Sequence, residues 1–314
     1  MFSASDNGVL VYETGSLQGG WRLSWFTRDG KPAGTVGDVD RYFNPALSPD
    51  GKRLAVAVVS GLGTSDIWIL DLMRNTKTRL TFGSFIQTSP VWSADGKTVF
   101  YRSSIKGLFH IYAKAADGSG AEQTVLESNN AFETPQSSSP DQRYLAYLRR
   151  QSDAKTATEI WALPLFGDRK PFPVVQTEFN QAGSVVSPDG KWLAYDTDAS
   201  GLYEIYITAF PGAGAKWQVS TGGGLSAKWR RDGKELFFLD LSDNLVAVDV
   251  NTLGNTVRLG TPHVLFHATG GQALQQGAYD VTADGKKFIV DSGDINEESQ
   301  PLTLVQNWTA ELRK

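Results

Sequence analysis

The side chains best suited to chemistry in this chain stand at one fixed distance from a repeated turn. Seven such turns contain an aspartate. For the last six, the residues eight positions upstream are Tyr42, Gln87, Glu133, Gln181, Gly224 and Gln276. Asn44, Ser89 and Asn180 lie close by in the same alignment. Amide and carboxylate oxygens of this kind can coordinate a hard cation such as calcium or hydrogen-bond to a peptide backbone.

Metal and thiol chemistry have few candidate residues. Glu133 is the aligned residue that brings a formal charge, so it is the best candidate metal ligand, with calcium as the ion. A purely binding role would require no cofactor. The three histidines are His110, His263 and His267, and the last two lack the glutamate of the zinc-protease helix motif. The chain has no cysteine, which excludes disulfides, thiolate ligands and a cysteine nucleophile.

Motifs for phosphate binding and covalent catalysis are incomplete. Residues 96–98, Gly-Lys-Thr, copy the end of a phosphate-binding loop, but Val91 occupies the required upstream glycine position and a strand is expected instead of a helix. Residues 103–106 and 152–155 match Ser-x-x-Lys without its companion motifs, and no Gly-x-Ser-x-Gly elbow occurs. We therefore assign no catalytic residue from the sequence.

Charge and hydropathy argue against two classes of partner, nucleic acids and membranes. The 314 residues carry a formal net charge of −4, and no run of Lys and Arg exceeds two residues, whereas nucleic-acid binding relies on clustered cations. No apolar run approaches the roughly 18 residues that span a bilayer. We expect neither nucleic-acid binding nor membrane insertion, and we expect a monomer.

The elements that must position the polar residues repeat along the whole chain. The turn sequence Ser-x-Asp-Gly-Lys and its variants place aspartates at Asp6, Asp50, Asp95, Asp141, Asp189, Asp232 and Asp284, which are 44, 45, 46, 48, 43 and 52 residues apart. A period in this range is typical of an array of repeated supersecondary units.

One unit reads as four antiparallel strands. In the second copy, residues 44–48 and 53–59 flank the turn, 66–72 form a third strand, and 78–81 close the unit. Aspartate can accept a hydrogen bond from the backbone two residues on, and glycine supplies the positive φ of a tight hairpin. An acidic residue or histidine followed by Ile and an aromatic marks the third strand in four units. This is the pattern of a β-propeller blade.

The sequence therefore predicts an all-β fold, a single β-propeller domain over residues 1–314. Such units cannot bury both faces alone, so they must stack into a ring. Counting turns favours seven blades, with six as the alternative if the terminal copies combine into one blade. The innermost strands should begin near the upper mouth of the channel. There we predict a ligand-binding site of Tyr42, Asn44, Gln87, Glu133, Asn180, Gln181 and Gln276.

The repeat resembles that of known propellers. Ser-Pro-Asp-Gly-Lys followed by an apolar strand and Asp-Ile-Trp or Tyr is similar to the WD40-like repeat of TolB-type propellers. Residues 163–173, 210–212, 216–220, 229–237 and 307–309 resemble the C-terminal propeller of bacterial membrane-anchored serine/threonine protein kinases. The resemblance implies a sensor or docking role and an extracytoplasmic or periplasmic location. The kinase motifs themselves are absent. Met1 stands directly before Phe2-Ser-Ala-Ser, which reads as a strand, so we expect an excised domain.

Two functions from different classes fit these observations. The first is a non-catalytic binding or sensor propeller that recognises a protein, peptide or small ligand at its top face and central channel. The alternative is a hydrolase of the lactonase, esterase or phosphotriesterase type, with a calcium ion in the channel that polarises a carbonyl or phosphoryl oxygen. A third possibility is a structural spacer.

Overall fold

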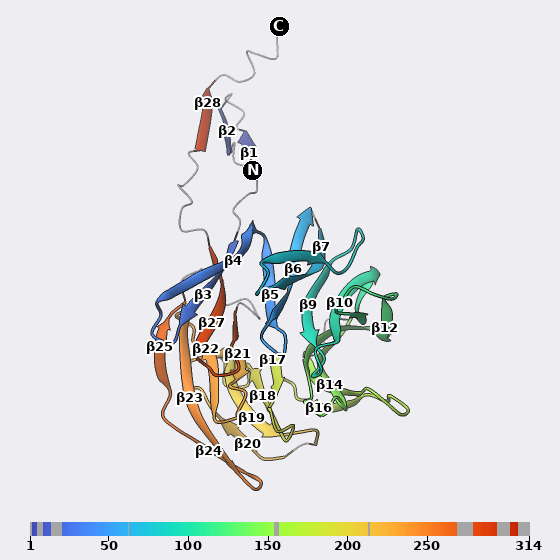
Figure 1. Ribbon diagram of the computed structural model, residues 1–314, viewed down its shortest axis with the longest axis vertical. Coiled ribbons are helices and arrows are strands. Elements are labelled where there is room, and N and C mark those ends of the chain that lie inside the picture. The colour runs from blue at the N-terminus through green and yellow to red at the C-terminus, as the bar shows by residue number, and fades with distance from the viewer. Residues whose placement is uncertain are drawn as a thin grey trace.

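The computed structural model describes residues 2–4, 9–13, 21–61, 63–153, 157–212, 214–268, 279–293 and 302–306. Every regular element in these ranges is a β-strand, as the alternating pattern predicted. Six antiparallel sheets are arranged around a common centre, and the colours of Figure 1 run round the ring in chain order. The predicted β-propeller is confirmed.

Blades 2 to 6 each use a continuous stretch of chain. Blade 2 contains β5 (Tyr42–Leu47), β6 (Arg53–Gly61), β7 (Thr64–Asp71) and β8 (Thr76–Arg79); blade 3 contains β9 (Gln87–Trp92), β10 (Thr98–Lys106), β11 (Leu108–Ala115) and β12 (Gln123–Leu126). Blade 4 contains β13 (Ala131–Ser138), β14 (Tyr144–Gln151), β15 (Glu159–Pro164) and β16 (Phe172–Val175); blade 5 contains β17 (Gln181–Val186), β18 (Trp192–Thr197), β19 (Glu204–Ala209) and β20 (Lys216–Gln218). Blade 6 contains β21 (Leu225–Trp229), β22 (Glu235–Leu239), β23 (Asn244–Leu253), β24 (Thr256–Leu259) and β25 (His263–His267).

Blade 1 joins the two ends of the chain. Its inner strands are β26 (Tyr279–Val281) and β27 (Lys287–Gly293), and its outer strands are β3 (Trp21–Thr27) and β4 (Pro32–Asp40). β27 pairs with β3 antiparallel, and Figure 1 shows this red strand beside the blue one. The terminal copies each supply half a blade, so the ring has six blades. Our first choice of seven is wrong and the stated alternative is confirmed.

The remaining described strands form a separate three-stranded sheet. β1 (Phe2–Ala4) pairs with β2 (Val9–Glu13), which pairs with β28 (Leu302–Gln306). The turn aspartate predicted at Asp6 lies outside the described residues.

The repeated turn has a local cause that recurs from blade to blade. In blade 2, Ser48 Oγ donates to Asp50 Oδ1 at 2.6 Å, and the amide of Lys52 donates to the same oxygen at 3.1 Å. Gly51 follows with φ of 68°, where a side chain would be strained. The serine hydroxyl and the backbone amide hold the pKa of Asp50 below its usual range. The turn aspartate is therefore used by its own hairpin, as predicted.

The core lies between blades. The isoleucine of the third strand is fully buried in blades 2 to 5, at Ile67, Ile111, Ile160 and Ile205. Between blades 5 and 6, Trp192 and Trp229 pack with apolar residues of both sheets. Each inter-blade cluster exists because two sheets press their apolar faces together, so a single blade has no core of its own.

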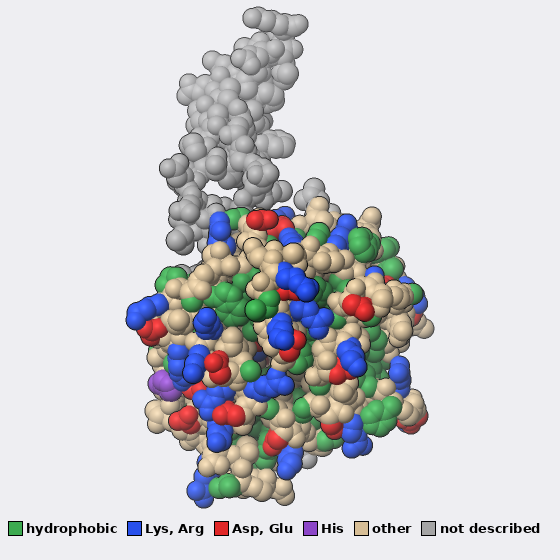
Figure 2. All heavy atoms as spheres, viewed as in Figure 1, with side chains coloured by type: hydrophobic (Ala, Val, Ile, Leu, Met, Phe, Trp, Pro, Cys, Tyr) green, Lys and Arg blue, Asp and Glu red, His purple; other side chains and the backbone are tan. Residues whose placement is uncertain are grey.

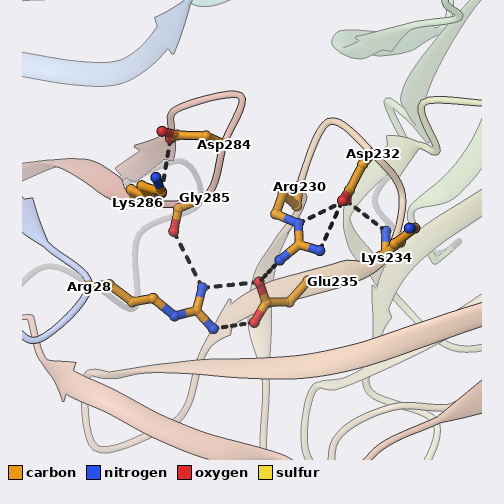
Figure 3. Close-up of polar contacts among 8 residues, drawn as sticks. All are labelled: Arg28, Arg230, Asp232, Lys234, Glu235, Asp284, Gly285 and Lys286. Carbon is orange, nitrogen blue, oxygen red and sulfur yellow. Dashed lines mark hydrogen bonds and ion pairs between the residues drawn. The ribbon is translucent and has the colours of Figure 1, made fainter.

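A polar network fastens blade 6 to both halves of blade 1 (Figure 3). Glu235 at the start of β22 is 2% exposed and receives the guanidinium groups of Arg28, which follows β3, and of Arg230. Arg28 Nη1 is 3.0 Å from Glu235 Oε2 and also donates to the carbonyl of Gly285 at 3.3 Å. Because Gly285 lies in the turn between β26 and β27, this network ties the N-terminal and C-terminal strands to one neighbour.

The outer surface carries both signs of charge. Figure 2 shows lysine and arginine side chains interspersed with aspartate and glutamate on the face that it presents. Among the described residues, no helix is long and apolar enough to cross a membrane.

Candidate functional site

The central channel is lined by the innermost strand of each blade. A narrow cavity of about 120 Å³ is bounded by residues of β5, β9, β13, β17 and β21, together with Asp196 of β18. In blades 2 to 6, the residue six positions upstream of the turn aspartate contributes to its lining, namely Asn44, Ser89, Pro135, Gly183 and Ser226. These positions, rather than the ones eight upstream, form the channel wall.

Local backbone irregularity aims these residues at the channel. Asn44, Ser89 and Ser226 have φ of 53°, 56° and 62°, in the left-handed region that asparagine tolerates better than most residues. The pairing of the first two strands shifts at the same place, for example between Phe43 and Ala46 of β5. A bulge of this kind bends the strand and redirects its side chains.

A wider pocket of about 640 Å³ opens beside the channel, and we call it the mouth pocket. Asn44 and Ser89 line both cavities, so the two adjoin. The mouth pocket is lined by Phe43, Asn44, Thr88, Ser89, Arg102, Phe109, Phe132, Thr134, Leu148, Arg150, Thr158, Gln181 and Tyr203. It combines four aromatic rings with two cations, and blades 3 and 4 supply both cations.

Arg102 is the central polar group of the mouth pocket. Its Nε donates to Thr88 Oγ1 at 2.7 Å, and its Nη1 donates to Thr134 Oγ1 at 3.3 Å. The guanidinium carbon lies 4.4 Å from the ring centroid of Phe109. Burial lowers the pKa of Arg102, although a guanidinium stays charged in proteins. Two hydroxyls and an aromatic face hold this cation in place without neutralising it.

Arg150 supplies the second positive charge. It pairs across the strands with Phe132, and its guanidinium carbon lies 5.5 Å from that ring centroid. The rings of Phe132 and Phe109 are 6.4 Å apart. Within the described ranges, neither Arg102 nor Arg150 forms an ion pair with a carboxylate. The pocket is therefore suited to a ligand that brings negative charge and apolar surface.

Three residues predicted for the site lie at or near the mouth pocket. Asn44 and Gln181 line it, although Gln181 is nearly buried and donates from Nε2 to Thr177 Oγ1 at 3.1 Å and to the carbonyl of Phe179 at 2.9 Å. Asn180 is exposed and donates from Nδ2 to Asp198 Oδ2 at 2.9 Å, which fixes the loop beside the pocket. Gln276 lies outside the described residues.

The structure places Tyr42, Gln87 and Glu133 elsewhere, as a correction to the predicted ring of channel residues. All three are buried. Tyr42 packs in the core between blades 1 and 2, and Gln87 exchanges backbone hydrogen bonds with the hydroxyl of Ser65 in the preceding blade. Residues two apart on a regular strand share a face, but the pairing shifts in β5 and β9 between the positions eight and six upstream, so Tyr42 and Gln87 pack away from the channel that Asn44 and Ser89 line.

Glu133 is committed to a contact between blades 3 and 4. Its Oε2 lies 2.8 Å from Nδ1 of His110, and its Oε1 accepts from Ser128 Oγ at 2.5 Å. Both carboxylate oxygens are thus occupied by protein groups. In the part of the chain that the structure describes, no group of three or more His, Asp or Glu residues is placed to hold a metal ion. Calcium binding at Glu133 stays a prediction.

Sequence reasoning missed the two arginines of the mouth pocket, although a signal for Arg102 was present. Arg102 stands seven residues after its turn aspartate, where blades 2, 4 and 6 have Ala57, Leu148 and Leu239. A charged residue at a strand position that is otherwise apolar marks a place where the interior reaches a polar cavity. The same comparison singles out Asp196 and Asp291.

Comparison with known proteins agrees with the fold. Residues 35–162 match a family model described as the TolB beta propeller domain. An uncharacterised protein of Agrobacterium fabrum is 33% identical over 76 residues, which cover 24% of this chain and 26% of that protein. The match thus spans about a quarter of the length of this curated relative.

Solved structures are similar over more of the chain. A putative TolB from Agrobacterium tumefaciens has a TM-score of 0.67 at 18% identity, covering 86% of this chain and 97% of that one. TolB from Acinetobacter baumannii has a TM-score of 0.57 at 18% identity, covering 90% and 66%. An oligogalacturonate lyase from Vibrio parahaemolyticus has a TM-score of 0.55 at 14% identity, covering 98% and 81%. At these identities the likeness shows the fold alone.

Proposed function

We propose that this chain, whose β-propeller is similar to that of a putative TolB, is a non-catalytic binding module that takes an acidic peptide or small acidic ligand in its mouth pocket. The observation that carries the proposal is Arg102, a cation in a pocket of about 640 Å³ with hydroxyl and aromatic partners only. A desolvated guanidinium forms its strongest hydrogen bonds with carboxylate or phosphate.

The rest of the pocket favours a ligand with an apolar part beside its acid. Phe109 and Phe132 lie next to each other, with Arg102 over the first and Arg150 over the second. Exposed apolar side chains, Phe179 and Leu202, stand near the rim residues Gln181 and Tyr203. A peptide with an acidic and an aromatic residue would satisfy both kinds of surface.

A binding assay with Arg102→Gln tests the proposal. The probe is a fluorescein-labelled hexapeptide of alternating Glu and Phe, with the matching Gln and Phe peptide as the neutral control. We expect the wild-type protein to bind the acidic peptide, and Arg102→Gln to weaken binding at least ~10-fold, because a charge-assisted hydrogen bond contributes about 1.5–3 kcal/mol. Fluorescence anisotropy measures both.

Arg143→Gln is the matched control. Arg143 also lies over two aromatic rings, those of Tyr144 and Phe166. It belongs to the turn of blade 4, however, and lines neither the cavity in the channel nor the mouth pocket. Equal binding of the acidic and neutral peptides, or equal weakening by both substitutions, would contradict the proposal.

The hydrolase alternative is tested by measuring turnover in the wild-type protein and in one variant. Turnover of nitrophenyl esters and of a phosphotriester is measured with and without chelator, and in Glu133→Ala. Turnover that both the chelator and the substitution abolish would replace the binding proposal. The extracytoplasmic location implied by the kinase-linked resemblance belongs to the proposal too, and cell fractionation of the source organism tests it.

A further inference from the structure

In blade 5, a residue of the second strand reaches the channel through the innermost layer. Asp196 is on β18, the second strand, yet it lines the 120 Å³ channel cavity. In front of it stands Gly183 of β17, and a Cβ at that glycine would lie only 2.8 Å from Asp196 Oδ2 and 3.3 Å from its Cγ. The missing side chain gives the carboxylate access to the channel.

The carboxylate of Asp196 is only partly satisfied. Its side chain is 0% exposed, and Oδ2 accepts a hydrogen bond of 2.9 Å from the amide of Ser226 in blade 6. Oδ1 has no hydrogen-bond partner among the described residues. Leaving a buried carboxylate oxygen without a donor is costly, and native proteins rarely do so without a reason.

A second polar atom without a partner lines the same cavity. Ser184, the residue after Gly183, is 8% exposed, and its Oγ likewise has no partner among the described residues. A hydroxyl oxygen and a carboxylate oxygen are both acceptors. Two acceptors without partners, on residues that line one small cavity, favour a ligand that donates hydrogen bonds and carries positive charge.

The charged groups nearby do not supply that cation. Lys228 of β21 also lines the cavity, but its Nζ lies 3.8 Å from Asp280 Oδ1 of blade 1. Burial raises the pKa values of Tyr203 and Tyr279, and nearby carboxylates that include Asp196 raise them further. Burial raises the pKa of Asp196 to about 7, opposed by the backbone amides of Ser226 and Ala227 and by the charge of Lys228. The carboxylate therefore lacks a close counter-ion.

We propose that the channel cavity binds a primary ammonium group, which donates hydrogen bonds to Asp196 Oδ1 and Ser184 Oγ. An ammonium offers three donors on a narrow stem, so it fits a cavity of about 120 Å³ that holds only a few waters. The group is the end of a lysine side chain or the α-amine of a peptide. This site is distinct from the anion-binding mouth pocket, and it stands even if that proposal fails.

The chain supplies a matched control for the aspartate. Asp291 of β27 occupies the same position in blade 1, is also buried, and has an unpartnered Oδ1 among the described residues. It lines neither the channel cavity nor the mouth pocket. A substitution there removes an equivalent buried carboxylate without touching the channel.

The experiment is an NMR titration of protein labelled with ¹³C at the aspartate carboxyl carbons. The probe is n-propylammonium chloride, with tetramethylammonium, sodium and calcium chlorides at equal ionic strength as comparisons. We expect n-propylammonium to shift the Asp196 signal saturably and to lower its apparent pKa. Tetramethylammonium has no N–H donor and should leave the signal unmoved. A response to sodium or calcium that equals or exceeds the response to n-propylammonium would overturn the proposal.

Three variants distinguish ammonium binding at this site from a general effect of removing a buried charge. Asp196→Asn should reduce affinity for n-propylammonium at least tenfold, by thermal shift, whereas Asp291→Asn should bind like the wild type. Gly183→Ala keeps the charge but fills the opening, and should also weaken binding. Retained binding in both Asp196→Asn and Gly183→Ala would overturn the proposal.

The source of the ammonium is resolved by two short ligands. Trialanine amide with a free amino end tests the α-amine, and Nα-acetyl-lysine methylamide tests the side chain. N-acetylated trialanine amide is the blank. Binding of either amine above the blank supports the site and identifies its source, and binding of neither contradicts it.

Discussion

At the scale of single residues, function in this propeller depends on which side of a strand a residue faces. Glu133 and Thr134 are neighbours on β13, yet Glu133 contacts His110 in blade 3 while Thr134 lines the mouth pocket and contacts Arg102. One step along a strand moves a side chain to the opposite face. At the position of Asp196, blades 2, 4 and 6 have apolar residues, and Asp196 lines the channel cavity because Gly183 in front of it has no side chain.

Asp196 also makes stability depend on pH. Burial raises the pKa of Asp196 from 3.8 to about 7. Between these values the unfolded chain has lost the proton and the folded protein keeps it, so the free energy of unfolding falls as pH rises and levels off above about 7. Asp196→Asn should therefore stabilise the protein by about 1–4 kcal/mol near pH 8.

Urea denaturation at several pH values measures this effect. The difference between Asp196→Asn and wild type should shrink towards pH 4, where the carboxyl is protonated in both states. A difference that is constant over the whole range would show that the substitution acts through packing.

At the scale of elements, the turn is the unit that sets each blade. Blade 4 departs from the pattern, because Gln142 occupies the glycine position with φ of 60°. The left-handed conformation costs a non-glycine residue about 1–2 kcal/mol. The hydrogen bonds of its aspartate are nevertheless kept, since Ser139 Oγ and the amide of Arg143 both donate to Asp141 Oδ1.

Gln142→Gly should therefore stabilise the protein by about 0.5–1 kcal/mol, after the larger chain entropy of glycine in the unfolded state is subtracted. The reverse control is Gly51→Ala in blade 2, which has φ of 68° and no atom within 4 Å of the added Cβ. It should destabilise by about 1 kcal/mol from backbone conformation alone. Chemical denaturation compares the two, and a loss of stability in Gln142→Gly would refute the turn argument.

At the scale of the whole molecule, the ring depends on closure between the chain ends. β27 pairs with β3 over seven residues, from Lys287 opposite Thr27 to Gly293 opposite Trp21. Glu235 then links blade 6 to Arg28 on one half of blade 1, and Arg28 reaches Gly285 on the other half. Losing this contact weakens blade 1, where the ring is closed by the pairing of β27 with β3 and not by the continuous chain.

Glu235→Ala should destabilise the protein by about 2–4 kcal/mol, because two arginines are left without their buried carboxylate. As a control, Glu127→Ala removes the exposed partner of Lys106 and should cost much less, because exposed ion pairs contribute little to stability. Hydrogen exchange should rise first in β27 and β3 of the Glu235 variant. Equal effects of the two substitutions would refute a special role for closure.

The sequence by itself determined the all-β class, the blade as a four-stranded unit and the position of its turns. These features depend on local causes, such as Ser48, Asp50 and Gly51 acting within one hairpin. An acidic residue or histidine followed by Ile and an aromatic also identified the third strand in four units, and the structure buries Ile67 and its equivalents.

Only the tertiary structure decided the blade number and the site. Six blades follow from pairing between residues more than 250 positions apart, which no local pattern encodes. The site residues depend on bulges in the innermost strands, which move the channel wall from the Gln87 position to the Ser89 position. Arg102 and Asp196 acquire their chemistry from neighbouring blades, through Thr134 and Ser226. Burial and hydrogen bonding between distant segments, rather than spacing along the chain, select the residues that can bind.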